Sequence, residues 1–346
     1  MAEVDYSLAP VLLFDPVHAN QRTTRYALHE IGFRQIECVA NLKDLKTGLT
    51  EGTPALLVAE SSATDADIFK LVRSIRRSEL GNNPFVVILL TTWSRDTAHI
   101  RRAIECGADD LIVRPFSTMF AEERVRTLIK GRKDFIVTSD YIGPDRRKAP
   151  SADRTSAPAI EVPNLLKATV EADTEALSRG AKWIKEAKST VTGERLRRIA
   201  MRIVVNVELH MSKGAGNLAA KLETDDMQKS ARELRAQLLR AERREAAEIT
   251  EALIDQISSL DECKGALPVD TLKLIKELSM GAYAAYANGD SLERSRDEID
   301  RTVSNLRKRL QARAEEAKRR AEIAAVEGEA DGSGQDGEPE LKRAAM

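Results

Sequence analysis

Four residues with charged or hydroxyl side chains stand at or beside the ends of short apolar runs in the first third of the sequence. They are Asp15, Glu60, Thr91 and Arg114. The run before Glu60, Pro-Ala-Leu-Leu-Val-Ala, is typical of a buried strand, and it ends in a carboxylate. Because arginine forms strong, charge-assisted hydrogen bonds with carboxylates, we expect Arg114 to pair with Glu60.

The apolar runs alternate with amphipathic stretches of helical period. The predicted strands are 11–14, 36–39, 55–59, 85–90 and 111–113, and the predicted helices are 17–31, 96–106, 118–132 and one that begins near residue 64. Short apolar runs separated by helices indicate parallel strands that are covered on both faces. We therefore predict an α/β doubly wound, five-stranded parallel sheet over residues 10–132. In such a sheet the ligand site lies at the carboxyl ends of the central strands.

Several motifs within residues 10–132 occur in an order and spacing typical of one known family. The segments are VLLFD, ending at Asp15; PALLVAE, ending at Glu60; VVILLTT, containing Thr91; and GADDLIVRPF, residues 107–116. They resemble the receiver domain of bacterial two-component response regulators, which has the CheY-like fold. The resemblance implies an aspartate at the end of the third strand that accepts a phosphoryl group. It also implies two acids after the first strand that hold Mg²⁺, and a lysine before the proline of the last motif.

The sequence departs from this family at the positions that carry the chemistry. Glu60 replaces the acceptor aspartate, Pro16 replaces the second acid, Arg114 replaces the lysine, and Leu111 stands where a switching aromatic residue is usual. Mg²⁺ demands near-ideal octahedral oxygen ligation, to which proline contributes no side-chain oxygen. We therefore expect a degenerate receiver with no metal, no cofactor and no phosphoryl transfer. Its pocket is either held in one conformation by permanent charges or simply inert.

Residues 133–163 are rich in proline and small polar residues and are predicted to be a linker. The linker contains a basic cluster with Arg146 and Arg147, and Arg154 follows at a distance. Arginine forks suit phosphate groups, so the cluster is a candidate site for a nucleotide, by analogy with arginine-bearing CheY-like proteins that bind cyclic dinucleotides. The alternative is a solvated linker.

Residues 164–326 have a helical pattern almost throughout. Helices are predicted at 164–190, 194–222, 225–262, 268–288 and 291–326. Two apolar stripes run along this region, at Leu234, Leu238, Ile249, Leu253, Ile257 and Leu260, and at Ile299, Val303, Leu306 and Leu310. The second has the spacing of a coiled-coil seam. We expect an all-α bundle or coiled-coil domain that mediates self-association or partner contact, followed by a disordered tail at 327–346.

One histidine in the helical region has neighbours that suggest phosphotransfer. His210, Lys213 and Gly214 resemble the His-x-x-Lys-Gly signature of histidine phosphotransfer domains, which are four-helix bundles. The resemblance implies a phosphohistidine at His210 and a lysine one turn on, at Lys213, that neutralises the phosphoryl group. The alternative is a structural histidine beside a glycine-containing bend.

Composition limits the remaining function classes. Lysines and arginines number 54 against 55 acidic residues, so no global basic field points to nucleic acid or an anionic membrane. No apolar run approaches the length of about 20 residues that a membrane span needs. The N-terminus lacks the pattern of a signal peptide, and the three cysteines are scattered.

We therefore expect a cytoplasmic, non-catalytic signalling protein without nucleic-acid binding or membrane insertion. Its expected partners are a kinase, a phosphotransfer protein or a motor-type protein, with homo-oligomerisation through the helices as a further possibility. A phosphorelay intermediate through His210 and a nucleotide-responsive adaptor through Arg146 and Arg147 remain open.

Overall fold

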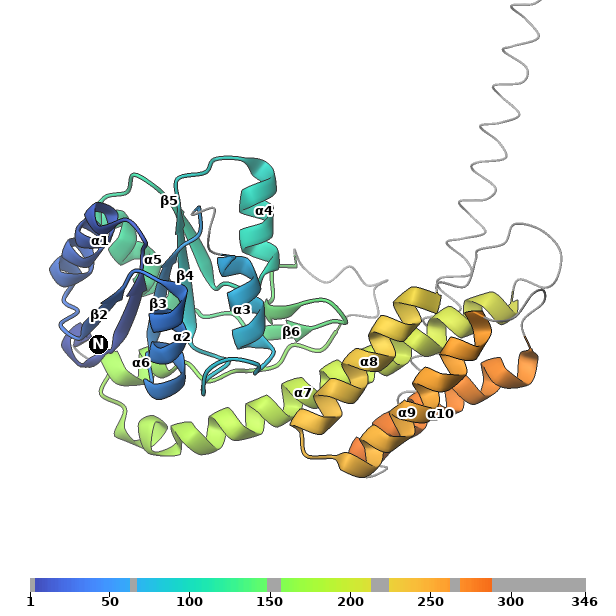
Figure 1. Cartoon of the computed structure of the whole chain (residues 1–346). Helices are drawn as coiled ribbons and strands as arrows, with labels where there is room; N and C mark the ends of the chain where they lie inside the picture. The colour runs from blue at the N-terminus through green and yellow to red at the C-terminus, as the bar shows by residue number, and fades with distance from the viewer. Residues whose placement is uncertain (1–3, 63–66, 148–156, 213–223, 262–267, 288–346) are drawn as a thin grey trace, which may run out of the picture.

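The computed structural model describes residues 4–62, 67–147, 157–212, 224–261 and 268–287. Its N-terminal part is an α/β layer structure, and a group of long helices follows (Figure 1). A small antiparallel sheet lies between these two parts along the chain.

A five-stranded parallel sheet forms the centre of the N-terminal part. Its strands are β1 (Val11–Phe14), β2 (Ile36–Val39), β3 (Leu56–Glu60), β4 (Val87–Thr92) and β5 (Asp110–Val113). Their order is β2-β1-β3-β4-β5, and all four pairings are parallel. The three central strands are completely buried, as expected for apolar strands covered on both faces. The predicted doubly wound sheet is therefore confirmed.

Helices cover both faces of the sheet. They are α1 (His18–Ile31), α2 (Leu42–Glu51), α3 (Ile68–Arg76), α4 (Thr97–Glu105) and α5 (Thr118–Lys130). One buried apolar cluster joins the sheet to α1 and α5, and another joins it to α2, α3 and α4. Helix α2 was not predicted, although Asn41 marks its start by accepting a hydrogen bond from the Asp44 amide.

The described residues of the predicted linker 133–163 contain a hairpin that the sequence analysis did not predict. Strands β6 (Phe135–Val137) and β7 (Ile142–Pro144) pair antiparallel, and Ile160 bridges to Phe135. The apolar side chains of the hairpin are buried against Phe85 of the sheet domain and against the middle of the long helix that follows. This burial stabilises a segment whose proline content favoured a linker. The ranges 10–132 and 164–326 stay predictions for the two domains.

A buried charge cluster fastens the hairpin to the amino-terminal edge of the sheet. Asp109, just before β5, forms ion pairs with Arg76 at 2.7 Å and with Arg132 at 2.9 Å. Both guanidinium groups also lie over the Phe135 ring, 5.0 and 5.2 Å from its centroid. Arg146 donates to the backbone oxygens of Ala108 and Asp109.

The helical part contains a four-helix bundle. The short helix α6 (Leu165–Val170) comes first along the chain. The bundle then consists of α7 (Thr174–Ser212), α8 (Thr224–Arg240), α9 (Arg244–Asp261) and α10 (Val269–Ala287). The last four share one buried apolar cluster, to which the predicted stripe from Leu234 to Leu260 contributes. That stripe is therefore a helix–helix contact, as predicted.

Three predicted helix boundaries were wrong. The predicted helix 164–190 is divided between α6 and α7 by a turn at Ala172, which has a φ of 50°. Helix α7 runs through Gly193, where a glycine costs only about 1 kcal/mol relative to alanine. A Cβ at Gly193 would lie 3.3 Å from the Tyr286 ring, so glycine here allows α10 to approach closely. The predicted helix 225–262 is divided by a turn at Glu242, which has a φ of 59°. Folding back at this turn buries the apolar stripes of α8 and α9 against each other.

The predicted seam from Ile299 to Leu310 and the tail 327–346 lie outside the described residues. Among the helices that are described, none combines the length and apolar character required to cross a bilayer.

Candidate functional site

The four residues singled out in the sequence meet at the carboxyl edge of the sheet. Asp15 follows β1, Glu60 ends β3, Thr91 lies in β4 directly opposite Glu60, and Arg114 follows β5. Each is at most 4% exposed to solvent. The strand order places these strand ends side by side, which brings four charged or hydroxyl side chains into one buried network.

Arg114 is the centre of this network. Its Nη2 forms an ion pair with Asp15 Oδ2 at 3.2 Å and donates to the hydroxyls of Thr24, at 2.6 Å, and Thr91, at 3.3 Å. The second oxygen of Asp15 accepts from the Val17 amide at 2.9 Å. Both carboxylate oxygens of Asp15 are therefore engaged within the chain.

The ion pair that the structure records for Arg114 is with Asp15, and the predicted pairing with Glu60 stays a prediction. Glu60 Oε2 accepts a hydrogen bond from the Ser62 amide at 2.7 Å, in the loop after β3. The longer glutamate side chain reaches the backbone of its own loop, while the guanidinium lies against α1, where Thr24 accepts its shortest hydrogen bond. Glu60 still acts on Arg114 through its charge.

Burial makes each charge in the site depend on the others. It raises the pKa of Asp15 above its usual value; the Val17 amide and Arg114 oppose this shift, whereas Glu60 adds to it. Burial also lowers the pKa of Arg114, while Asp15 and Glu60 act in the opposite direction. One cation thus stabilises two buried carboxylates.

The residues present do not fit the magnesium site that the fold implies. Asp15 has both oxygens engaged, and the exposed Pro16 offers no side-chain oxygen. Hard divalent cations need several oxygen ligands in defined geometry. No group of three or more His, Cys, Asp or Glu side chains in the described part of the chain is placed to hold a metal ion.

A hydroxyl and imidazole network beside the site was not found from the sequence. His99 Nε2 lies 3.1 Å from Ser61 Oγ and 3.0 Å from Thr92 Oγ1, and Ser62 Oγ lies 2.8 Å from Thr92 Oγ1. This network connects the loop after β3 to the end of β4 and to α4. No spacing in the sequence pointed to His99, since its partners come from separate strand ends.

The two linker arginines already have partners within the chain. Arg146 donates to backbone carbonyls at the base of the sheet, and Arg147 forms an ion pair with Asp145 at 2.5 Å and donates to the Ala157 carbonyl. These contacts give both residues a structural role and count against a phosphate site at this cluster.

His210 lies near the end of α7, within the four-helix bundle, and its side chain is partly exposed. Its position meets one requirement of the phosphotransfer hypothesis, which is a histidine on a bundle helix. Lys213, the second residue of that hypothesis, lies outside the described residues.

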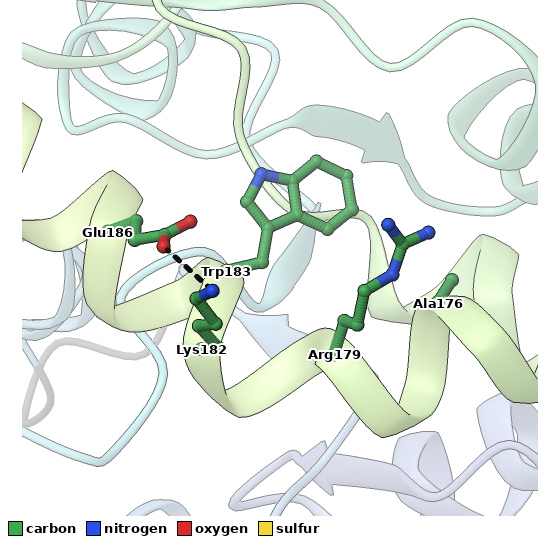
Figure 2. A pocket seen from close by; sticks show the side chains of 5 residues that line it. All are labelled: Ala176, Arg179, Lys182, Trp183 and Glu186. Atoms are coloured by element: carbon green, nitrogen blue, oxygen red, sulfur yellow. Dashed lines mark ion pairs between the residues drawn. The ribbon is translucent and has the colours of Figure 1, made fainter.

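A separate surface pocket of about 360 Å³ lies along α7 (Figure 2). The described residues that line it are Ala176, Arg179, Lys182, Trp183 and Glu186, with Lys182 and Glu186 paired at 3.8 Å. None of them belongs to the Arg114 network.

Comparison with known proteins gives the same assignment for the N-terminal third. The chain is 28% identical over 116 residues to the phosphate regulon transcriptional regulatory protein PhoB of Rhizobium meliloti, a match that covers 33% of this chain. The chain spans about half the length of this curated relative, 49%. No family model matches the sequence.

Solved receiver domains are similar to the same region. A response regulator receiver domain from Bermanella marisrubri is 23% identical, with 35% of this chain and 98% of that chain covered and a TM-score of 0.32. The chemotaxis protein CheY4 of Vibrio cholerae is 16% identical, with 34% of this chain and 97% of that chain covered and a TM-score of 0.31. These scores are low, so the fold assignment rests on the strand order and registers described above. The N-terminal third is a receiver-like, CheY-like domain followed by helices.

Proposed function

We propose that this chain is a cytoplasmic signalling adaptor whose receiver-like domain does not accept a phosphoryl group. The domain instead presents one fixed conformation to partner proteins, and the helical domain provides a second contact surface. The observation that carries this proposal is the Arg114 guanidinium, bound to Asp15, Thr24 and Thr91 inside the pocket.

Arg114 accounts for the fixed conformation in physical terms. A phosphorylatable receiver needs a metal ion to neutralise the charge that develops during transfer. Here a covalently attached cation lies among the carboxylates. Its hydrogen bonds join α1, β1 and β4, so a change of any one of these elements would break a buried, charge-assisted contact.

The acceptor position supports the same proposal. The extra methylene of Glu60 moves the nucleophilic oxygen by more than about 1 Å relative to an aspartate, and a misplacement of that size can cost about a hundredfold in rate. The adaptor therefore has no catalytic role of its own. Its partners are signalling proteins, such as kinases or phosphotransfer proteins, rather than nucleic acid.

Restoring the family residues tests this proposal. The variant Pro16→Asp/Glu60→Asp/Arg114→Lys should become labelled by acetyl phosphate in the presence of Mg²⁺, detected as an increase in intact mass. The unaltered chain should remain unlabelled under the same conditions. Labelling of the unaltered chain on Glu60 would contradict the proposal. The variant Glu60→Asp alone is the matched control. It should stay unlabelled, because Arg114 still forms the ion pair with Asp15 and Pro16 still provides no oxygen ligand.

A second candidate function is phosphotransfer through His210, favoured by the four-helix bundle around it. The helix carries the imidazole at a partly exposed position, as a nucleophile requires. Incubation with a phosphorylated receiver protein should then give an acid-labile label that His210→Ala abolishes. A label that persists in His210→Ala, or no label at all, would exclude this function.

A further inference from the structure

A basic surface covers α3 and the adjoining part of α4. Its residues are Lys70, Arg73 and Arg77 on or just after α3, and Arg102 on α4. Lys70 and Arg102 are exposed, and the other two are partly exposed. None of the four forms an ion pair within the part of the chain that the structure describes, and residues 68–77 contain no acidic side chain.

The α3 and α4 parts of this surface are in contact. The Arg102 guanidinium of α4 lies 4.7 Å from the centroid of the Phe69 ring on α3. Burial raises the pKa of the Cys106 thiol at the end of α4, and the Ala108 backbone hydrogen bond and the charges of Arg76, Arg73 and Arg146 oppose that shift. Arg73 therefore lies close to the same end of α4. Figure 1 shows α3 and α4 side by side on one side of the sheet.

The chain leaves the described bundle close to this surface. Near the end of α10, the Tyr286 hydroxyl donates to the Ser189 carbonyl of α7 at 3.4 Å, and the Arg243 guanidinium lies 5.9 Å from the Tyr286 ring centroid. Arg243 follows the end of α8, where Arg240 forms an ion pair with Glu79 at 3.0 Å. Glu79 lies just after α3, so the last described turn of α10 is at the receiver-facing end of the bundle.

A strongly acidic segment occurs farther along the same chain. Residues 327–340 carry six carboxylates and no lysine or arginine, although the whole chain is almost neutral. Residues 288–326 separate the segment from Ala287, and even as the predicted helix a stretch of this length spans roughly 58 Å at about 1.5 Å per residue.

We propose that the acidic segment 327–340 binds the basic surface formed by Lys70, Arg73, Arg77 and Arg102. This inference goes beyond the adaptor function and does not require it. Because the segment belongs to the same chain, the contact is intramolecular, and weak ionic contacts suffice to hold it. The contact covers the basic surface against other acidic peptides, and it weakens as salt screens the charges.

A peptide titration on the full-length chain tests the contact. In one variant all six carboxylates are neutralised: Glu327→Gln, Glu329→Gln, Asp331→Asn, Asp336→Asn, Glu338→Gln and Glu340→Gln. A fluorescein-labelled peptide of residues 327–340 should bind this variant at low salt at least about tenfold more tightly than the unaltered chain, whose own segment competes at high effective concentration. Binding should disappear at high ionic strength.

Matched variants assign the surface. Adding Lys70→Gln/Arg73→Gln to the neutralised chain should abolish most of the peptide binding. Adding Lys43→Gln/Lys46→Gln, an equal change of exposed charge on α2, should leave it intact. Equal peptide affinity for the neutralised and unaltered chains would overturn the proposal. Equal loss of binding in the α3 variant and the α2 variant would overturn it as well. Binding of a DNA duplex in place of the peptide would overturn it in favour of a nucleic-acid surface.

Discussion

Arg114 supplies the positive charge at the carboxyl edge of the parallel sheet. It contributes a single positive charge to a site with two buried carboxylates, and it is joined to the chain by a covalent bond. A bound metal can leave and return, whereas an arginine side chain remains. At the residue scale, the proposed function therefore requires a charge arrangement that does not switch.

Removal of the Arg114 charge should destabilise the domain strongly. In Arg114→Met the side chain keeps a similar length, but Asp15 loses its counter-ion inside the protein. Leaving one partner of a buried pair uncompensated typically costs about 3–5 kcal/mol. Urea denaturation, followed by circular dichroism, measures the loss in the free energy of unfolding.

The control for this experiment is Arg101→Met, which removes an exposed guanidinium paired with Glu105. Exposed helix pairs contribute little, so this variant should unfold at the same urea concentration as the unaltered chain. Equal shifts for Arg114→Met and Arg101→Met would show that the buried network is not what holds this edge of the sheet.

Sequence patterns predicted which residues meet at this site but not which atoms bind each other. The ends of parallel strands converge, so the apolar runs were sufficient to bring Asp15, Glu60, Thr91 and Arg114 together. The partner of Arg114 depends on Thr24, whose position on α1 relative to the sheet is a property of packing. The His99 contacts were missed for the same reason.

At the scale of elements, the hairpin packs on a buried cluster of one carboxylate, Asp109, and two guanidinium groups, those of Arg76 and Arg132. Because the cluster is buried, the charge of each group depends on its partners. Burial alone would raise the pKa of Asp109, but Arg132, Arg76 and the hydrogen bonds outweigh it, and the pKa is lowered. Burial lowers the pKa of Arg76 to about 10 despite Asp109. The cluster connects α3, β5 and the segment that leads into β6.

Asp109→Asn should therefore destabilise the chain and change its response to acid. Two buried guanidinium groups lose their counter-ion, which costs about 3–5 kcal/mol at neutral pH. Because the folded-state pKa of Asp109 is lowered, its contribution is present above the unfolded-state value of about 3.9 and is lost as pH falls through the folded value.

Thermal unfolding between pH 7 and pH 3 measures this difference. The gap in stability between the unaltered chain and Asp109→Asn should be widest at neutral pH and should narrow below about pH 4. A gap that is constant over this range would mean that the Asp109 charge does not act through Arg76 and Arg132.

Close backbone contact provides a second anchor for the hairpin. Gly107 has a φ of 97°, and a Cβ at this position would lie 2.4 Å from the Ile142 carbonyl oxygen. Gly107→Ala should lower the free energy of unfolding by at least about 1 kcal/mol, because both the backbone and the contact become strained.

Gly281→Ala is the natural comparison, since nothing lies within 4 Å of a Cβ added there in the interior of α10. This variant should be stabilised by about 0.5–1 kcal/mol through helix propensity. Chemical denaturation of the two variants would refute the contact argument if both were stabilised.

The hairpin shows where sequence patterns fail at the element scale. Phe135, Val137 and Ile142 alternate with other residues over very short runs, and proline and small polar residues surround them. Only the packing against Phe85 and α7 makes these runs strands. Long elements with a full apolar stripe, such as α9, were predictable because the stripe itself requires a partner.

On the scale of the whole molecule, the hairpin joins the receiver-like domain to the bundle. The hairpin packs apolar side chains against α7, and its Asp140 forms an ion pair with Arg202. Outside the hairpin, Glu79 after α3 forms an ion pair with Arg240 of α8. Exposed ion pairs contribute little by themselves, so the apolar contact supplies most of the coupling.

Phe135→Ala should uncouple the two parts. The side chain is fully buried, and its truncation typically costs about 3–5 kcal/mol. Trp93 in the receiver-like domain and Trp183 in α7 report on the two parts separately in Trp93→Phe and Trp183→Phe backgrounds. With Phe135 present, the fluorescence denaturation curves of the two single-tryptophan chains should coincide. With Phe135→Ala added to both, the two curves should separate. Separate curves in the unaltered chain would contradict rigid coupling.

The most direct test of a locked, non-phosphorylatable pocket is a calorimetric titration of the full chain with beryllofluoride in the presence of Mg²⁺. The Arg114–Asp15 pair and Pro16 leave no set of oxygen ligands for the metal, so the account predicts no binding heat. Stoichiometric binding that Asp15→Asn abolishes would contradict it and would assign a working phosphoacceptor site to this edge of the sheet.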